Sequence, residues 1–206
     1  MKRILISLLP LMMPVFAHAD SIAVDIYSQE RLRDLIKQDR YLEQVKADDC
    51  QLVQDIEARA LVLKQPLYQY LWGEMLNYGV CVPANPSSGM EQLQKAAEQG
   101  SPEAMVLLAE YYQDGRFVVQ NKDRAVQYVL PAAANGHQTA RMMLARLMAQ
   151  GYGSPRDYEL AYHWLFNEVF SDEATKLEAL TLLQGLEAKM PASVVKRARK
   201  ASLNGR

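Results

Sequence analysis

Residues 101–136 read SPEAMVLLAEYYQDGRFVVQNKDRAVQYVLPAAANG, which predicts two short helices joined by a glycine turn. The unit recurs along the chain. Gly79, Gly115 and Gly151 follow one another at intervals of 36 residues, and Gly100 and Gly136 keep the same interval. Other pairs with this spacing are Ala104 and Ala140, Ala125 and Ala161, Asn85 and Asn121, and Tyr128 and Trp164. A fixed period of this length indicates a solenoid of repeated units.

The local sequence explains why each unit forms a helical hairpin. Ser101 can cap a helix that begins at Pro102, because its hydroxyl accepts a hydrogen bond from a free backbone N–H. Apolar residues then follow at spacings of three and four: Ala104, Leu107, Leu108, Tyr111 and Tyr112. Gly115 tolerates the left-handed turn that ends a helix. A second helix is expected from about Asp123 to Ala134. One such pair cannot bury its apolar face alone, so neighbouring units must stack on it.

The predicted fold is therefore all-α, an α/α solenoid with helical caps at both ends. We expect an N-terminal cap over residues 20–65, repeats at about 65–100, 101–136 and 137–172 (66–170 for the core of the array), and C-terminal capping helices over residues 171–206. In the N-terminal cap, helices are expected from Gln29 to Gln38 and from Asp48 to Leu63. The caps would cover apolar ends of the array that would otherwise meet water.

The N-terminus predicts export from the cytoplasm. Lys2 and Arg3 precede the apolar run Ile4–Phe16, and Ala17–Ala19 supplies the small residues of a cleavage site. We interpret residues 1–19 as a signal peptide cut before Asp20. The alternative is a membrane anchor, for which the run is short and interrupted by proline. No later stretch is apolar enough to cross a bilayer, so the mature chain is expected in the periplasm without membrane insertion.

The chain contains two cysteines, Cys50 and Cys81. In an exported protein such a pair most often forms one disulfide. The bond would close a loop of about 30 residues and contribute roughly 3–4 kcal/mol. The alternative is a pair of free or metal-binding thiols, although two thiols alone make a poor zinc site because four ligands are usual.

Little in the sequence points to catalysis. The 23 basic and 24 acidic residues nearly balance, which argues against nucleic acid as the main partner. His137 and His163 have no obvious nucleophile or metal partner. No phosphate-binding glycine motif follows a strand. We therefore expect no catalytic residue, no cofactor and no metal site.

Two groups of side chains are candidates for binding a partner protein. The first is a set of tyrosines whose hydroxyls could reach the concave face, although their helical spacing also fits core packing: Tyr111, Tyr112, Tyr158 and Tyr162. The second is a basic cluster that either forms a solvated face offsetting the dipole of the last helix or docks an acidic partner: Lys196, Arg197, Arg199 and Lys200.

The repeat resembles the Sel1-like repeat, a relative of the tetratricopeptide repeat. Residues 101–136 carry that pattern almost in full: Ala104, Leu108, Ala109, Tyr112, Gly115, Phe117, Asn121, Ala125, Tyr128, Ala132, Ala133 and Gly136. The third repeat loses the closing Ala-Ala-x-x-Gly, and the first keeps Gly79, Asn85 and Gly100. The resemblance covers about half of the chain and implies the fold more than the function.

The arrangement of the whole chain resembles a family of periplasmic components of sodium-driven polar flagellar motors. This resemblance rests on the signal peptide, the helical head, the three repeats and the segment YGSPRDYELAYHWLFNEVFSDEATK at residues 152–176. It implies a structural role, in which the protein joins a MotY-like ring protein around the basal body and helps to hold stator units with a PomB-type subunit. Two alternatives are a general periplasmic Sel1-repeat adaptor and a cell-wall-related hydrolase. Exported Sel1-like proteins of the hydrolase kind are rich in cysteines, unlike this chain.

Overall fold

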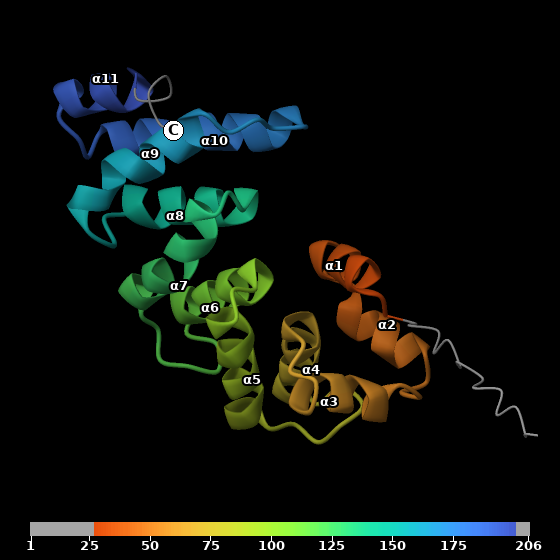
Figure 1. The fold of residues 1–206 in the computed structure, drawn as a ribbon. Helices are drawn as coiled ribbons and strands as arrows, with labels where there is room; N and C mark the ends of the chain where they lie inside the picture. The colour runs from red at the N-terminus through yellow and green to blue at the C-terminus, as the bar shows by residue number, and fades with distance from the viewer. Residues whose placement is uncertain (1–26, 201–206) are drawn as a thin grey trace, which may run out of the picture.

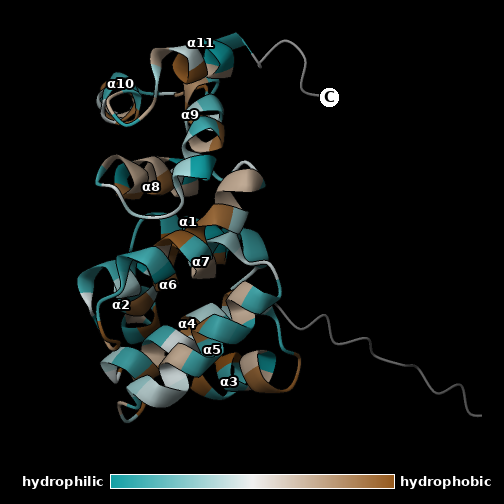
Figure 2. Cartoon of the chain, turned by 90° about the vertical axis from the view of Figure 1, so that its left-hand side faces the viewer, coloured by the Kyte–Doolittle hydropathy of each residue, from teal (hydrophilic) through white to brown (hydrophobic). Residues whose placement is uncertain are grey.

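The structure is a computed structural model that describes residues 27–200, and the regular structure of this part is entirely helical. Three helix pairs form its centre: α4 (Pro66–Tyr78) with α5 (Pro86–Glu98), α6 (Pro102–Asp114) with α7 (Lys122–Ala134), and α8 (Gln138–Ala149) with α9 (Tyr158–Phe166). The helices of each pair pack together, α5 packs on α6, and α7 packs on α8. The pairs thus stack in one column (Figures 1 and 2), and the predicted α/α solenoid is confirmed.

The 36-residue period of the sequence is also the period of the structure. The first helices begin at residues 66, 102 and 138, and the second helices begin at residues 86, 122 and 158. Asn85 and Asn121 cap the second helices, because their side-chain oxygens accept from backbone N–H groups at 3.2 and 2.9 Å. Gly79 and Gly115 end the first helices with φ of 66° and 73°, a left-handed conformation that glycine adopts without steric cost.

The third pair departs from the pattern at its C-terminal end. Helix α9 stops at Phe166, and Glu168 and Val169 stand where the second repeat has Ala132 and Ala133. A carboxylate cannot replace a fully buried alanine, and Glu168 instead forms an ion pair of 2.6 Å with an arginine of α8. The chain then forms α10 (Glu173–Glu187), which packs on α8, and α11 (Ala192–Lys200), which packs on α9.

The N-terminal head contains three helices that all contact α4: α1 (Gln29–Lys37), α2 (Tyr41–Ala47) and α3 (Val53–Leu61). The expectation of one helix from Asp48 to Leu63 was wrong, because α2 precedes it and α3 begins only at Val53. Asp49 and Cys50 have φ of 51° and 59°. A left-handed backbone at two successive residues is incompatible with an α-helix, so the chain turns between α2 and α3.

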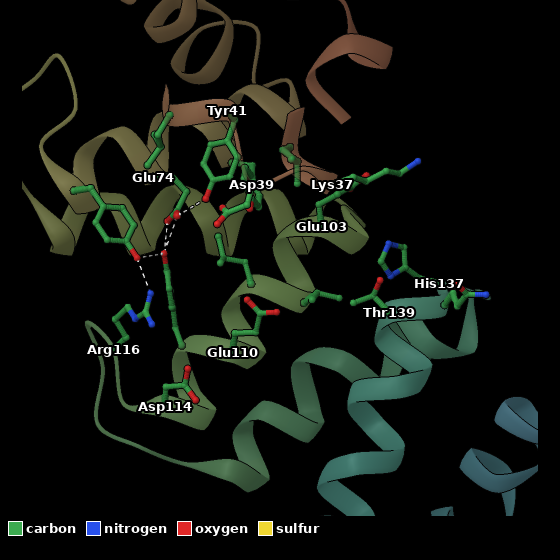
Figure 3. Close-up of a pocket in the computed structure, with 18 of the residues that line it drawn as sticks. Lys37, Asp39, Tyr41, Glu74, Glu103, Glu110, Asp114, Arg116, His137 and Thr139 are labelled. Carbon is green, nitrogen blue, oxygen red and sulfur yellow. Dashed lines mark hydrogen bonds between the residues drawn. The ribbon is translucent and has the colours of Figure 1, made fainter. Parts of the chain in front are cut away.

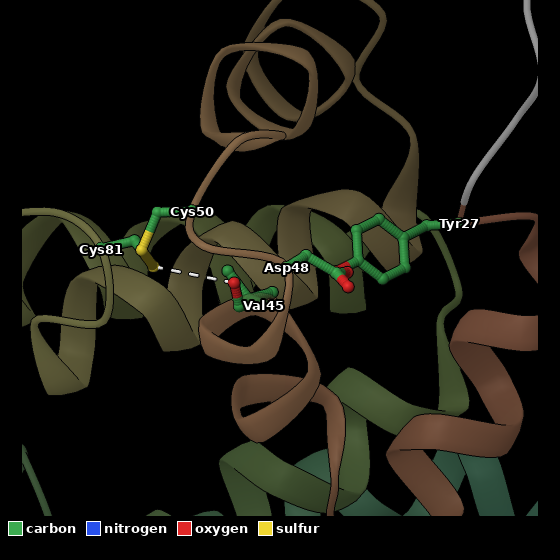
Figure 4. Close-up of a disulfide and its surroundings, with 5 residues drawn as sticks. All are labelled: Tyr27, Val45, Asp48, Cys50 and Cys81. Atoms are coloured by element: carbon green, nitrogen blue, oxygen red, sulfur yellow. Dashed lines mark hydrogen bonds between the residues drawn. A yellow bond between two sulfur atoms is a disulfide. The ribbon is translucent and has the colours of Figure 1, made fainter.

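A disulfide between Cys50 and Cys81 fastens the head to the first repeat (Figure 4). It joins the turn after α2 to the loop between α4 and α5, and it confirms the predicted pairing. A hydrogen bond supports the same junction, because the Tyr68 hydroxyl of α4 donates to the backbone carbonyl of Tyr27 at 2.6 Å. Within the head, the Tyr27 hydroxyl donates to the carboxylate of Asp48. The head is therefore held by a covalent bond as well as by packing.

The helices of the first repeat approach each other closely at Gly73 and Gly89. A Cβ atom on Gly89 would lie 2.6 Å from the carbonyl oxygen of Gly73 and 2.2 Å from Oδ1 of Asn77. The equivalent residues in the second repeat, Ala109 and Ala125, are fully buried. Small side chains at this crossing therefore set the distance between the two helices of a repeat.

We expect Gly89→Ala to lower the free energy of unfolding by about 1–2 kcal/mol, because α4 and α5 must separate to admit the methyl group. This loss should exceed the gain of about 1 kcal/mol in helix propensity. Urea denaturation of both proteins gives the difference. Ser87→Ala, at an exposed position of the same helix, is the control and should cost little. A Gly89→Ala protein more stable than its parent would contradict the close approach.

Within residues 27–200, no helix combines the length and the hydropathy that crossing a bilayer requires. The predicted signal peptide at residues 1–19 lies outside the described residues, as does the end of the chain from residue 201 onward.

Candidate functional site

A cleft of about 1010 Å³ opens between the head and the inner side of the solenoid (Figure 3). The first helices of the repeats form one wall, and the end of α1 and the start of α2 form the other. Glu74 and Glu110 both line the cleft and lie 36 residues apart, so they occupy the same position in successive repeats. Each of the helices α4 and α6 therefore carries a carboxylate at the equivalent position, facing the cleft.

Glu74 lies at the floor of the cleft with 1% of its surface exposed. Its carboxylate accepts hydrogen bonds from the hydroxyl of Tyr111 at 2.7 Å, from the hydroxyl of Tyr41 at 2.9 Å and from the side-chain amide of Asn77 at 2.9 Å. Burial raises the pKa of Glu74, and the three hydrogen bonds oppose that rise. Burial also raises the pKa of Tyr41 and Tyr111, which therefore remain neutral donors.

Three further carboxylates surround this floor: Asp39, Glu110 and Asp114. Figure 3 shows Asp39 on the side of the head and Glu110 on α6 across the cleft from it. Desolvation by the walls raises the pKa of Glu110, and the negative charges of Asp114 and Asp39 raise it further, although the side chain keeps access to solvent. Glu110 and Asp114 are four residues apart on one helix, where like charges repel each other.

The positive charges at the cleft are fewer than the negative ones. Among the described residues that line it, Lys37 and Arg116 are the permanent cations, and Arg116 donates to the hydroxyl of Tyr78 at 3.0 Å. Glu103 forms an ion pair of 3.3 Å with Arg33 of α1. His137 caps α8 through Nδ1, and its burial lowers its pKa, so it adds no charge at neutral pH. The cleft is therefore acidic.

A second hollow of about 460 Å³ continues the cleft along α8 towards α10. It shares Glu110 and Asp114 with the first, and Met142 and Met143 supply apolar lining. Arg146 occupies the position equivalent to Glu74 and Glu110 in the third repeat and pairs with a glutamate of α10. The acidic stretch thus ends at the third repeat.

The four candidate tyrosines do not form one surface. Tyr111 reaches the cleft through the hydroxyl that it donates to Glu74. Tyr112 stacks on Tyr128, with ring centroids 5.3 Å apart, and Tyr158 is 4% exposed in the core. Tyr162 is fully buried and donates to Glu187 of α10 at 2.6 Å. A role of these tyrosines in partner binding stays a prediction.

The four candidate basic residues, Lys196, Arg197, Arg199 and Lys200, lie together on exposed positions of α11 at the far end of the column. Arg197 forms an ion pair with Glu159 of α9, and Arg199 forms one with Glu187. Arg199 also donates to the hydroxyl of Tyr162 at 2.8 Å. These contacts fasten α11 to the helices beneath it and offset part of its charge. Binding of an acidic partner here stays a prediction.

The sequence alone did not single out the residues of the cleft. Two signals were present: Glu74 is a lone carboxylate inside the apolar run YLWGEMLNY, and Glu110 repeats it 36 residues later. Asp39 and Tyr41 reach the cleft only because the head folds back over the repeats, and no periodicity predicts that contact.

Comparison with known proteins agrees with this architecture. The Sel1 repeat family matches residues 66–101, 102–137 and 139–166, so the chain is a Sel1-repeat protein. A solved Sel1 repeat protein from Oxalobacter formigenes has the same fold, with a TM-score of 0.50 and 22% identity over 72% of this chain and 97% of that one.

One relative specifies the family more closely. The sodium-type polar flagellar protein MotX of Vibrio parahaemolyticus serotype O3:K6 is 39% identical over 180 residues, which are 87% of this chain and 85% of that protein. The chain belongs to the MotX family. The alginate biosynthesis protein AlgK of Pseudomonas syringae pv. tomato is 28% identical over 171 residues, and this chain spans only 32% of its length.

Proposed function

We propose that this chain is a structural component of a sodium-driven polar flagellar motor, located in the periplasm at the basal body. The observation that supports it best is the identity of 39% to MotX across nearly the full length of both proteins. Sel1 repeats are modules of protein interaction, and the cleft offers an interaction surface with hydrogen-bonded, neutral tyrosines rather than an activated nucleophile. The proposed role is therefore binding without catalysis.

In this proposal the chain joins a MotY-like protein in a ring around the basal body and helps to recruit and hold PomA/PomB-type stator units. An elongated solenoid suits such a role, because its surfaces lie far apart and can contact different proteins. Helices α2 and α4, which line the cleft, and the basic helix α11 lie at different levels of the column (Figure 1). We propose that each surface meets a different partner.

Deletion of the gene in the organism that encodes it tests the proposal. We expect loss of sodium-driven swimming while polar flagella are still assembled, because a protein that holds stator units is needed for torque and not for the filament. The full-length chain supplied on a plasmid should restore swimming. A deletion strain that swims like its parent would contradict the motor role.

A second candidate function is that of an envelope adaptor outside the motor. The match to AlgK favours it, because that protein is 28% identical to this chain and is named for alginate biosynthesis and not for motility. Normal swimming together with a defect in another envelope process would support the adaptor.

A further inference from the structure

We propose that the cleft between the head and the solenoid binds a lysine- or arginine-bearing segment of another protein. The inference deepens the proposed function, on which it rests, because it names the chemistry of the segment that the chain would hold. Three features of the cleft support it: its shape, its excess of carboxylates and its apolar walls.

The chain itself compensates the excess of negative charge inside the cleft only in part. Asp39 of the head lies across the opening from Glu110 and Asp114 of α6, and the charge of Asp39 acts on Glu110. Among the described residues that line the cleft, two permanent cations stand against these three carboxylates, and the positive charge of Arg116 opposes the rise in the pKa of Glu110. Crowded like charges lower stability unless a ligand offsets them. A cationic side chain between Asp39 and Glu110 would relieve that repulsion.

The walls suit a protein segment better than a small cation. Ile36 and Leu42 of the head are only partly buried, and Tyr78 exposes 43% of its surface at the rim. These groups can bury the stems of long basic side chains and the residues between them. A volume of about 1010 Å³ exceeds what one ammonium group needs, and Glu110 and Asp114 also line the neighbouring hollow, which extends the space available along α8. Charge and apolar contact together favour an extended segment.

A second copy of this chain is the less suitable occupant. Its basic helix α11 already uses Arg197 and Arg199 in ion pairs with its own Glu159 and Glu187. Inserting that helix into the cleft of a neighbour would break those contacts. We therefore assign the cleft to a different protein.

Fluorescence anisotropy with a labelled peptide that alternates lysine and alanine tests the inference. The purified chain should bind this peptide, and added salt should weaken the binding because exposed charges are screened. The triple variant Asp39→Asn/Glu110→Gln/Asp114→Asn should bind at least about tenfold more weakly. Asparagine suits position 39, where φ is 53°, since it tolerates the left-handed conformation.

The matched control is Glu57→Gln/Glu91→Gln/Glu98→Gln, which removes the same charge from α3 and α5, outside both hollows. It should keep the affinity of the parent. Equal binding by the triple variant, equal binding of a glutamate–alanine peptide, or equally tight binding of spermidine would overturn the inference. So would self-association of the parent that the triple variant abolishes, because the occupant would then be a second copy.

The two proposals fail separately. If the peptide binds as described but the deletion strain swims normally, the proposed binding by the cleft is supported and the proposed motor role is rejected. If the deletion strain loses swimming but the triple variant binds the peptide like its parent, the motor role is supported and the proposed binding by the cleft is rejected.

Discussion

Replacing Cys50 and Cys81 together with serine is expected to lower the free energy of unfolding by about 3 kcal/mol. The bond joins residues with a sequence separation of 31, so its loss frees a long loop in the unfolded chain. It also removes the covalent link between the head and the first repeat. Urea denaturation followed by tryptophan fluorescence measures the effect, because Trp72 lies in α4, on which the head packs.

The reduced parent protein is the control for the disulfide. Its unfolding curve should match that of the double serine variant, because both lack the covalent link. Hydrogen exchange should show the largest gain in α1 to α3, which the bond fastens to the repeats. Equal melting temperatures of the oxidised parent and the double variant would contradict a stabilising role.

The repeats were predictable because each one carries its own local signals. Asn85 and Asn121 begin helices, and Gly79 and Gly115 end them, at positions that periodicity reveals without any knowledge of tertiary structure. The early end of α9 could also be anticipated, since the third repeat lacks the closing alanines and glycine.

The head was less predictable because its conformation depends on contacts far along the chain. Nothing near Asp49 and Cys50 requires a left-handed backbone, and glycine, the usual signal for it, is absent there. The disulfide and the contact between Tyr27 and Asp48 stabilise the turn instead. Helix α2 was missed for the same reason.

The cleft was only half predictable. Aligning the repeats places Glu74 and Glu110 on equivalent faces, so a carboxylate on the inner side of the solenoid follows from the sequence period. Tyr41 and Asp39 come from the head, and their position depends on how the head docks. The tyrosine candidates show the limit of spacing arguments, because Tyr111 and Tyr112 are adjacent in sequence and face different surroundings.

Glu74→Ala is expected to lower the free energy of unfolding by about 2 kcal/mol. The substitution leaves the hydroxyls of Tyr41 and Tyr111 and the amide of Asn77 without their acceptor in a buried site. Part of that cost is offset, because the buried carboxylate no longer has to be desolvated. The variant also loosens the contact between the head and the repeats, since the hydrogen bond from Tyr41 crosses that junction.

Glu74→Gln separates the hydrogen bonds from the charge. The amide oxygen can still accept from both tyrosine hydroxyls, and the amide nitrogen faces Asn77, whose otherwise unpartnered side-chain oxygen can turn to accept from it. This variant should therefore unfold close to the parent at low pH. The folded state raises the pKa of Glu74 above its ordinary value of 4.5. The unfolded chain therefore releases the proton first as pH rises, and the parent loses stability relative to Glu74→Gln above about pH 4.5. Denaturation of both proteins across this range measures the difference.

Glu110→Ala is the matched control for Glu74→Ala, because it removes the carboxylate from the equivalent position of the next repeat. Glu110 is exposed to solvent, so its loss should change stability by no more than about 0.5 kcal/mol. The comparison distinguishes a carboxylate that organises buried donors from one that only adds charge to the cleft. Two results would contradict the role given to Glu74. One is an equal loss of unfolding free energy in the two alanine variants, and the other is a stability difference between the parent and Glu74→Gln that does not vary with pH.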